Sequence, residues 1–316
     1  MLKKILFVDN STRCFRIFRL PIAKTFIAQG YEVYVMSPSP YETYVERIME
    51  TGAIHIPYEM NAKFSPWGDL KLLFLYWRTY RQLKPNYVIH YTIKPNIYGS
   101  LAARANKIPS LAVVPGTGSV FQNSGMVSRM VGQLYKWAFR YPQKIWVLNE
   151  DDYRAFLVKN IVNQDRLAIL PGEGGDTSFF CYKEYKRHSP FVFLYMGRML
   201  REKGVEFMAK AVKLLHQKGN DDFEVRLLGM VDGLSKDVIS EEEISQWEKE
   251  GLVRFLGSTS DVRPDIEEAD CVLLPTFYGE GVPRSLMEAC SMGRIVLATD
   301  NVGCRDVVLD GYNGIL

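Results

Sequence analysis

Short strand-like runs alternate with longer amphipathic stretches along the whole chain, and this alternation constrains the fold more than any other feature. The amphipathic stretches include 69–83 and 126–140, while the short runs are rich in β-branched and aromatic residues. Such alternation is typical of βαβ units and parallel sheets. The expected strands are Lys4–Val8, Glu32–Met36, Ala53–Ile56, Tyr87–His90, Leu111–Val114, Lys144–Leu148, Phe191–Met196, Glu224–Leu228, Val253–Leu256, Cys271–Leu274 and Ile295–Ala298. Each half of the chain therefore predicts a doubly wound, Rossmann-like α/β domain.

The alternation stops between Pro171 and Pro190. Turn formers and charges fill this segment without sustained periodicity. We expect an N-terminal domain over 1–170, a linker over 171–190 and a C-terminal domain over 191–316. A chain of 316 residues with 47% hydrophobic content is long enough for two cores of ordinary size.

Cysteine usage and hydropathy indicate an intracellular protein. None of the five cysteines lies in a CxxC or other close pair, which favours neither a disulfide framework nor a zinc site. The apolar run that precedes Asp9 is only four residues long, too short for a signal peptide. No stretch reaches the ~20 apolar residues of a membrane-spanning helix. We expect a cytoplasmic protein that is soluble or peripheral at the inner face of the cell membrane.

The charge is divided unevenly along the chain. The net charge is +3, but residues 1–170 carry 22 Lys and Arg against 11 Asp and Glu, a balance of +11, which leaves −8 for the rest. Without an RNA-binding signature, a basic N-terminal half predicts an anionic partner such as a membrane surface or a phosphorylated lipid. Scattered solvated charge is the alternative interpretation.

Two further clusters lie in the N-terminal half, and the first of them bears on that partner. Arg13, Arg16, Arg19 and Lys24 alternate with apolar residues, a mixture that suits anionic lipid or an amphipathic helix with its apolar side in the core. Trp67 and the 72–77 cluster are expected in the core.

A first chemical motif follows the strand Phe191–Met196. It reads Gly197-Arg-Met-Leu-Arg-Glu-Lys-Gly204 and precedes a helical pattern. Arg198 and Lys203 place two cations beyond the carboxyl end of a strand, where open parallel sheets bind ligands, and near a helix N-terminus that favours anions. A diphosphate suits such a site. A solvated loop with ordinary surface charges is the alternative.

A second motif follows the strand Cys271–Leu274. Pro283 suits the first helical position and Gly293 the C-terminal cap, which puts Glu280 in the loop at the helix mouth and Glu288 inside the helix. The two carboxylates can accept hydrogen bonds from different hydroxyls of one extended ligand, while amides near Gly281 meet its anionic part. Taken alone, Glu288 also fits an ordinary surface position.

These motifs resemble a known family. Glu-Gly-Val-Pro-Arg-Ser-Leu-Met-Glu over 280–288 resembles the Glu-x7-Glu motif of retaining family 4 glycosyltransferases of the GT-B fold, and 197–204 resembles their diphosphate-binding segment. The segments 91–99, 116–118, 170–176 and 301–306 resemble a branch that builds bacterial surface polysaccharides, such as capsule or lipopolysaccharide, or lipid-linked oligosaccharides. The resemblance covers nearly the whole chain in the right order.

The resemblance implies a reaction and a set of site residues. The donor is expected to be a nucleoside-diphosphate hexose or N-acetylhexosamine, with UDP as the nucleotide, and the acceptor a lipid-linked glycan met by the N-terminal domain. Arg198 and Lys203 would neutralise the leaving diphosphate in place of a metal, so no metal or other cofactor is expected. Glu280, Gly281 and Val282 would hold the donor sugar and Glu288 the ribose, with retention by front-face attack. Further substrate contacts are implied at Tyr91, Thr92, Lys94, Gly116, Thr117 and Gly118.

Two departures from the family pattern stand out. Many relatives have a histidine after the fourth strand that contacts the donor sugar, but here Tyr91 takes that position and His90 lies one place earlier. The chain also ends at Leu316, where relatives usually continue for a few dozen residues, so the C-terminal domain is expected to be truncated.

Three other functions compete with this interpretation. One is another GT-B enzyme, such as a sugar-nucleotide epimerase or a phosphorylase. Another is a protein that binds nucleotide sugars without catalysis. A nicotinamide dehydrogenase is disfavoured because the first strand is followed by Asp9-Asn-Ser-Thr-Arg-Cys14, without the GxGxxG phosphate fingerprint.

Overall fold

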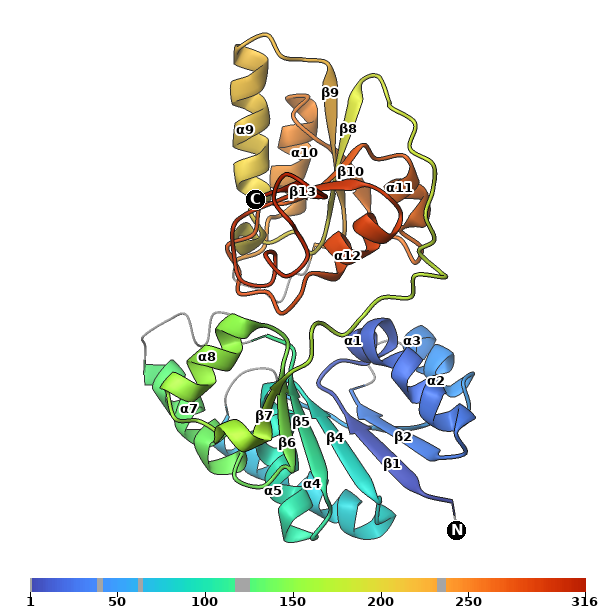
Figure 1. Cartoon of the computed structure of the whole chain (residues 1–316), viewed down its shortest axis with the longest axis vertical. Coiled ribbons are helices and arrows are strands. Elements are labelled where there is room, and N and C mark those ends of the chain that lie inside the picture. The colour runs from blue at the N-terminus through green and yellow to red at the C-terminus, as the bar shows by residue number, and fades with distance from the viewer. Residues whose placement is uncertain (1, 39–41, 62–64, 117–125, 232–236) are drawn as a thin grey trace. The chain divides into compact units, whose positions relative to one another are not determined.

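The structure, a computed structural model, describes residues 2–38, 42–61, 65–116, 126–231 and 237–316. The chain divides into two compact units, 1–173 and 174–316. Each unit is a parallel sheet with helices packed around it (Figure 1).

The first unit holds a seven-stranded sheet in the order β3-β2-β1-β4-β5-β6-β7. Its strands are β1 (Lys4–Val8), β2 (Glu32–Ser37), β3 (Ile54–Pro57), β4 (Tyr87–Tyr91), β5 (Ser110–Val114), β6 (Lys144–Val147) and β7 (Leu167–Ile169). Its helices are α1 (Thr12–Cys14), η1 (Phe15–Arg19), α2 (Leu20–Ala28), α3 (Glu42–Met49), α4 (Pro66–Leu83), η2 (Pro95–Gly99), α5 (Ser100–Ala105), α7 (Met126–Ala138), α8 (Glu150–Val158) and η3 (Gln164–Arg166). The order reverses between β1 and β4, so the carboxyl ends of these strands form the crevice where such sheets bind ligands.

The second unit holds a six-stranded sheet in the order β10-β9-β8-β11-β12-β13. Its strands are β8 (Phe191–Met196), β9 (Phe223–Leu228), β10 (Arg254–Gly257), β11 (Cys271–Leu274), β12 (Ile295–Ala298) and β13 (Gly314–Ile315). Its helices are η4 (Arg201–Lys203), α9 (Val205–Gln217), α10 (Glu241–Lys249), α11 (Arg263–Glu267) and α12 (Arg284–Ser291). Here the order reverses between β8 and β11, which places the two predicted motifs on neighbouring loops.

All eleven predicted strands are confirmed to within one residue at each end. Their continuous apolar runs fit strands that are covered by helices on both faces. The prediction omitted β7 and β13, which have three and two residues. Runs this short carry no periodicity to read.

Helix α4 corrects one expectation about the core. Trp67 is 79% exposed and Phe74 is 59% exposed, whereas Tyr76 and Tyr80 are fully buried. Ser65 caps the helix by accepting a hydrogen bond from the Gly68 N–H. Because each residue turns a helix by about 100°, positions 67 and 74 fall on the face opposite to the buried tyrosines. The expectation that Trp67 and the whole 72–77 cluster are core was therefore wrong.

The segment that opens the second unit packs against its sheet. Phe180 lies in the hydrophobic core of this unit. The buried carboxylate of Asp270, just before β11, accepts hydrogen bonds from the Tyr185 hydroxyl at 2.8 Å, the His188 N–H at 3.1 Å and the Val192 N–H at 2.7 Å. Burial acts to raise the pKa of Asp270, but these donors outweigh it and lower that pKa.

Asp270→Asn should lower the free energy of unfolding by about 2 to 3 kcal/mol at neutral pH, because hydrogen bonds to a charged acceptor are lost. A carboxyl with a lowered pKa stabilises the fold above its unfolded-state pKa, and that contribution disappears as the pH falls through the folded-state value. The difference between variant and wild type, measured by urea unfolding across a pH series, should therefore shrink in acid. A difference independent of pH would contradict this account.

Candidate functional site

The candidate site of the second unit is built where two neighbouring strands end. β8 and β11 pair in parallel, so the loops 197–204 and 275–283 leave the same edge of the sheet. The sequence predicts Arg198 and Lys203 on the first loop and Glu280 on the second. The structure brings the two loops into contact.

An ion pair joins the loops directly. Lys203 Nζ contacts Glu280 Oε1, and the two side chains are only 14% and 12% exposed. The Thr276 hydroxyl donates to the same Glu280 oxygen at 3.1 Å, and Lys203 lies over the Tyr278 ring at 5.0 Å. A partly desolvated charge pair with a further hydrogen bond is a fixed feature rather than a solvated surface contact. Lys203 and Glu280 therefore form the centre of this site.

Backbone contacts hold the loops at this distance. The Phe277 and Tyr278 N–H groups both donate to the Glu202 carbonyl, at 3.0 and 3.1 Å. Gly204 has a φ of 78°, and a Cβ added there would lie 2.0 Å from the Pro275 carbonyl oxygen. Only glycine fits this crossing point.

A third loop supports the second one. The Asn301 side-chain amide donates to the carbonyls of Thr276 at 3.1 Å and Tyr278 at 2.9 Å. Thr276 and Asn301 were not given roles by sequence analysis, although 301–306 was part of the family resemblance. The signal that could have identified Asn301 is its place just beyond the end of β12, at the same edge of the sheet as the two motifs.

Arg198 lies beside the ion pair. Its side chain is exposed, and its carbonyl accepts a hydrogen bond from the buried Tyr195 hydroxyl at 2.8 Å. Burial raises the pKa of Tyr278, and the positive charge of Arg198 partly offsets that rise. The charge of Arg198 therefore acts on the same Tyr278 ring that Lys203 covers.

Glu288 stands on helix α12, apart from that ion pair. It accepts a hydrogen bond from Arg284 Nε at 2.6 Å and is 12% exposed. Burial raises the pKa of Glu288 against the opposing effect of Arg284. Arg284 was not predicted as its partner, although an i, i+4 spacing on a helix is the signal for such a pair. Pro283 is the N-cap of α12 rather than its first helical residue, while Gly293 follows the helix with a φ of 76° as expected.

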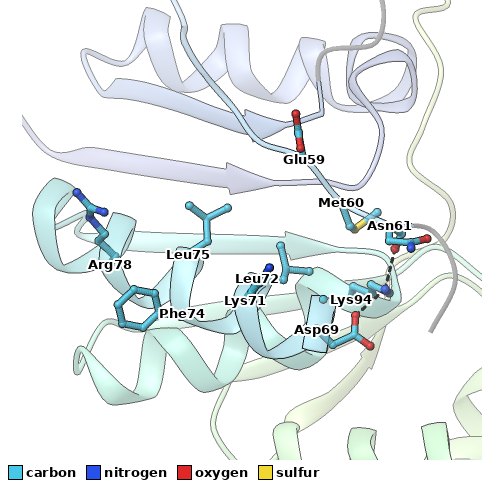
Figure 2. Close-up of a pocket in the computed structure, with 11 residues that line it drawn as sticks. Glu59, Met60, Asn61, Asp69, Lys71, Leu72, Phe74, Leu75, Arg78 and Lys94 are labelled. Atoms are coloured by element: carbon cyan, nitrogen blue, oxygen red, sulfur yellow. Dashed lines mark hydrogen bonds and ion pairs between the residues drawn. The ribbon is translucent and has the colours of Figure 1, made fainter. Parts of the chain in front are cut away.

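The predicted site residues of the first unit follow two of its central strands. Thr92 comes directly after β4 with a φ of 68°, which is unusual for a branched residue and is often found at functional sites. Lys94 donates to Asp69 Oδ1 at 2.6 Å and to the Asn61 carbonyl at 2.7 Å, as the dashed lines of Figure 2 show. Gly116 follows β5 with a φ of 148°. Thr117 and Gly118 lie outside the described residues.

Tyr91 and Arg19 are buried together. Tyr91 is 4% exposed, and the Arg19 guanidinium lies over its ring at 4.6 Å. Arg19 is 2% exposed and pairs with Asp9 at 3.3 Å and Glu173 at 3.1 Å. Of the two interpretations of the cluster that includes Arg19, the lipid-facing one fails for this residue, because two carboxylates hold it inside the first unit.

His90 is a core residue. It is fully buried, and its Nε2 lies 3.0 Å from the Tyr80 hydroxyl. Burial lowers its pKa to about 3, so the ring is neutral at physiological pH. A Cβ added at Gly99 would lie 2.4 Å from this ring, so glycine is required for the imidazole to fit.

Within the described ranges, no three His, Cys, Asp or Glu side chains gather as a metal site would require. No helix among them is both long and apolar enough to cross a membrane.

Comparisons with known proteins agree with the two-unit architecture. Residues 4–149 match the family model described as glycosyl transferase 4-like, and residues 190–316 match the model of glycosyl transferases group 1. The chain belongs to the group 1, or family 4, glycosyltransferases.

Relatives of this glycosyltransferase cover most or nearly all of it. An N,N'-diacetylbacillosaminyl-diphospho-undecaprenol alpha-1,3-N-acetylgalactosaminyltransferase of Campylobacter jejuni is 26% identical over 99% of this chain and 84% of its own length. A UDP-Gal:alpha-D-GlcNAc-diphosphoundecaprenol alpha-1,3-galactosyltransferase of Escherichia coli is 24% identical over 78% of this chain and 66% of its own. HepE of Anabaena, crystallised with UDP and glucose, matches with a TM-score of 0.79 at 19% identity, covering 99% of this chain and 85% of HepE. The glycosyltransferase has the GT-B fold.

Replacing Arg198 or Lys203 by Ala should weaken the binding of UDP by roughly 1.5 to 3 kcal/mol each, the range for hydrogen bonds to charged groups. Isothermal titration with UDP measures this directly. Lys210→Ala is the matched control, because Lys210 lies on the following helix and pairs with Glu206 at 2.6 Å. UDP affinity that stays unchanged in both site variants would refute the assignment of Arg198 and Lys203 to a diphosphate site.

Proposed function

We propose that this glycosyltransferase moves a hexose or N-acetylhexosamine from a UDP-sugar to a lipid-linked glycan during surface-polysaccharide synthesis. The observation that carries the proposal is the Lys203–Glu280 pair at the strand ends, with Arg198 beside it. The Campylobacter and Escherichia relatives are named for undecaprenol-diphosphate acceptors, and HepE was crystallised with UDP. These names support the choice of donor and acceptor.

The ion pair can serve both parts of the donor. An ammonium has three N–H donors, so Lys203 can hold Glu280 and still donate to a diphosphate oxygen. A carboxylate has about four acceptor positions, so Glu280 can accept from Lys203, Thr276 and the sugar hydroxyls together. Arg198 adds a second cation for the charge that grows on the leaving diphosphate, and such preorganised charges stabilise a transition state.

The remaining site residues have separate tasks in this proposal. Glu288, held by Arg284, accepts hydrogen bonds from the ribose, and the backbone at Gly281 and Val282 meets the sugar. On the first unit, Thr92, Lys94 and Gly116 stand at the carboxyl ends of their strands, where the acceptor is expected. Tyr91, which packs against the buried Arg19 guanidinium, supports this edge of the sheet.

Removing the central charges should slow transfer in addition to weakening donor binding. Lys203→Ala and Glu280→Gln should each reduce kcat by about 10² to 10³, the scale for loss of one preorganised electrostatic contact. The assay is release of UDP from UDP-sugars with an undecaprenyl-diphosphate-linked acceptor in detergent. Glu250→Gln is the control, because it removes an exposed ion pair, with Lys213, outside the candidate site. Sugar conversion with donor alone would instead identify an epimerase, and donor binding without turnover a binding protein.

Transfer should persist in excess EDTA, because Arg198 and Lys203 supply the positive charge that a divalent metal would otherwise supply. Activity is measured before and after chelation, and again after adding manganese. Loss on chelation with recovery on manganese would contradict the proposal.

The glycosidic bond should have the same anomeric configuration as the sugar in the donor. The Campylobacter relative is named for an alpha-linked product, which agrees with retention if its donor sugar is alpha-linked to the diphosphate. The proton NMR coupling at the anomeric carbon of the product decides the matter. An inverted product would refute front-face transfer.

A further inference from the structure

We propose that Thr276 is a positioning residue for sugar transfer, which acts by holding the carboxylate of Glu280 in the orientation that the donor sugar requires. This role rests on the proposed function, in which Glu280 accepts hydrogen bonds from the sugar hydroxyls. It goes beyond that function because Thr276 is fully buried and contributes to transfer only through the side chain that it holds.

The backbone around Thr276 is held by the neighbouring loop. Asn301, just beyond β12, donates its side-chain amide to the Thr276 carbonyl at 3.1 Å and to the Tyr278 carbonyl at 2.9 Å. These two hydrogen bonds lie on either side of Phe277 and fix the path of the chain through it. The Thr276 side chain therefore leaves a backbone that is already fixed before a substrate binds.

One direction is favoured for the hydroxyl hydrogen of Thr276. Its oxygen lies 3.1 Å from Glu280 Oε1 and 3.3 Å from the Glu202 carbonyl oxygen, and a hydroxyl has one hydrogen to donate. The Glu202 carbonyl has two lone pairs and already accepts from the N–H groups of Phe277 at 3.0 Å and Tyr278 at 3.1 Å. The carboxylate is closer, and a charged acceptor forms the stronger bond. The hydrogen therefore points to Glu280.

The oxygen of the same hydroxyl is engaged as an acceptor. The Tyr278 N–H donates to it at 3.1 Å. This bond holds the rotamer of Thr276, because turning the side chain to another staggered position would carry the oxygen away from the amide. The hydrogen bond to Glu280 thus has a fixed origin as well as a fixed target.

Lys203 supplies charge to Glu280, whereas Thr276 supplies direction. Both contact Oε1 of the carboxylate, but an ammonium on a long stem acts as a flexible point charge. The last torsion of a glutamate is intrinsically broad, so a directional partner is needed to fix it. A misplacement of about 1 Å in a contact that positions the substrate can cost about a hundredfold in rate. The hydroxyl should therefore matter for transfer more than for binding of the nucleotide.

The test begins with Thr276→Val, which removes the hydroxyl and keeps the branched shape, while the Tyr278 N–H retains its bond to the Glu202 carbonyl. UDP should bind this variant as it binds wild type, because Arg198 and Lys203 are unchanged. The kcat for UDP release with the lipid-linked acceptor should fall about 10- to 100-fold, the effect of one hydrogen bond to a charged group. Thr276→Ser should restore most of kcat, because serine supplies the same hydroxyl.

A double-mutant cycle separates this role from a general disturbance of the loop. Thr276→Val is combined with Glu280→Ala, which removes the acceptor of the hydroxyl. Because Thr276 acts through Glu280, the valine should lower kcat less than about twofold in the Glu280→Ala background. Ser291→Ala is the matched control, because it removes a hydroxyl hydrogen bond to the Phe180 carbonyl, at 2.6 Å, in the same unit. It should leave kcat unchanged.

The outcomes distinguish this role from the proposed function. Wild type that releases no UDP from any UDP-sugar with the lipid-linked acceptor would overturn both. Wild-type turnover together with an undiminished kcat in Thr276→Val would overturn the role of Thr276 alone. Failure of Thr276→Ser to restore kcat, UDP affinity that falls along with kcat in Thr276→Val, or an equal loss with and without the Glu280 carboxylate would also overturn that role.

Discussion

The contact between Lys203 and Glu280 is the interaction on which the second unit's site depends. It joins loops from two strands that are neighbours in the sheet but nearly eighty residues apart in the chain. With both side chains mostly buried, loss of one partner would leave a desolvated charge. The Glu202 carbonyl, the Gly204 crossing and the Asn301 amide all act to keep the loops at the spacing that this pair requires.

A buried charge cluster also organises the first unit. There one cation meets two carboxylates, whereas the loops of the second unit carry two cations and one carboxylate. One arginine, Arg19, lies between two carboxylates and over Tyr91. Burial raises the pKa of Asp9 despite the nearby guanidinium. The arginine connects the end of β1, the end of β4 and the last residue of the unit, Glu173. Arg19 thus holds the strand ends of the first unit together within its core. Lys203 instead holds the loops of the second unit together at the edge of the sheet where a ligand is expected.

Much of the fold followed from the sequence because strand periodicity is local. Arg198, Lys203, Glu280 and Glu288 could be named because short motifs mark the ends of strands. The partners could not, since Thr276 meets Glu280 only through the path of its loop and Glu173 meets Arg19 across the whole unit. Trp67 was misplaced for a related reason: a hydrophobic residue on a helix indicates a face, and only packing shows whether that face is covered.

The uneven charge of the chain takes on a clearer meaning in three dimensions. Part of the basic excess of the first half is neutralised internally, as at Arg19, and cannot act on a partner. What remains outside includes Lys71 and Arg78, which stand on one helix among exposed aromatic residues. The second half is acidic overall, yet it collects two cations at the strand ends of its sheet. Local placement rather than net charge therefore decides where an anion can be bound, and the proposed diphosphate site lies within the more acidic unit.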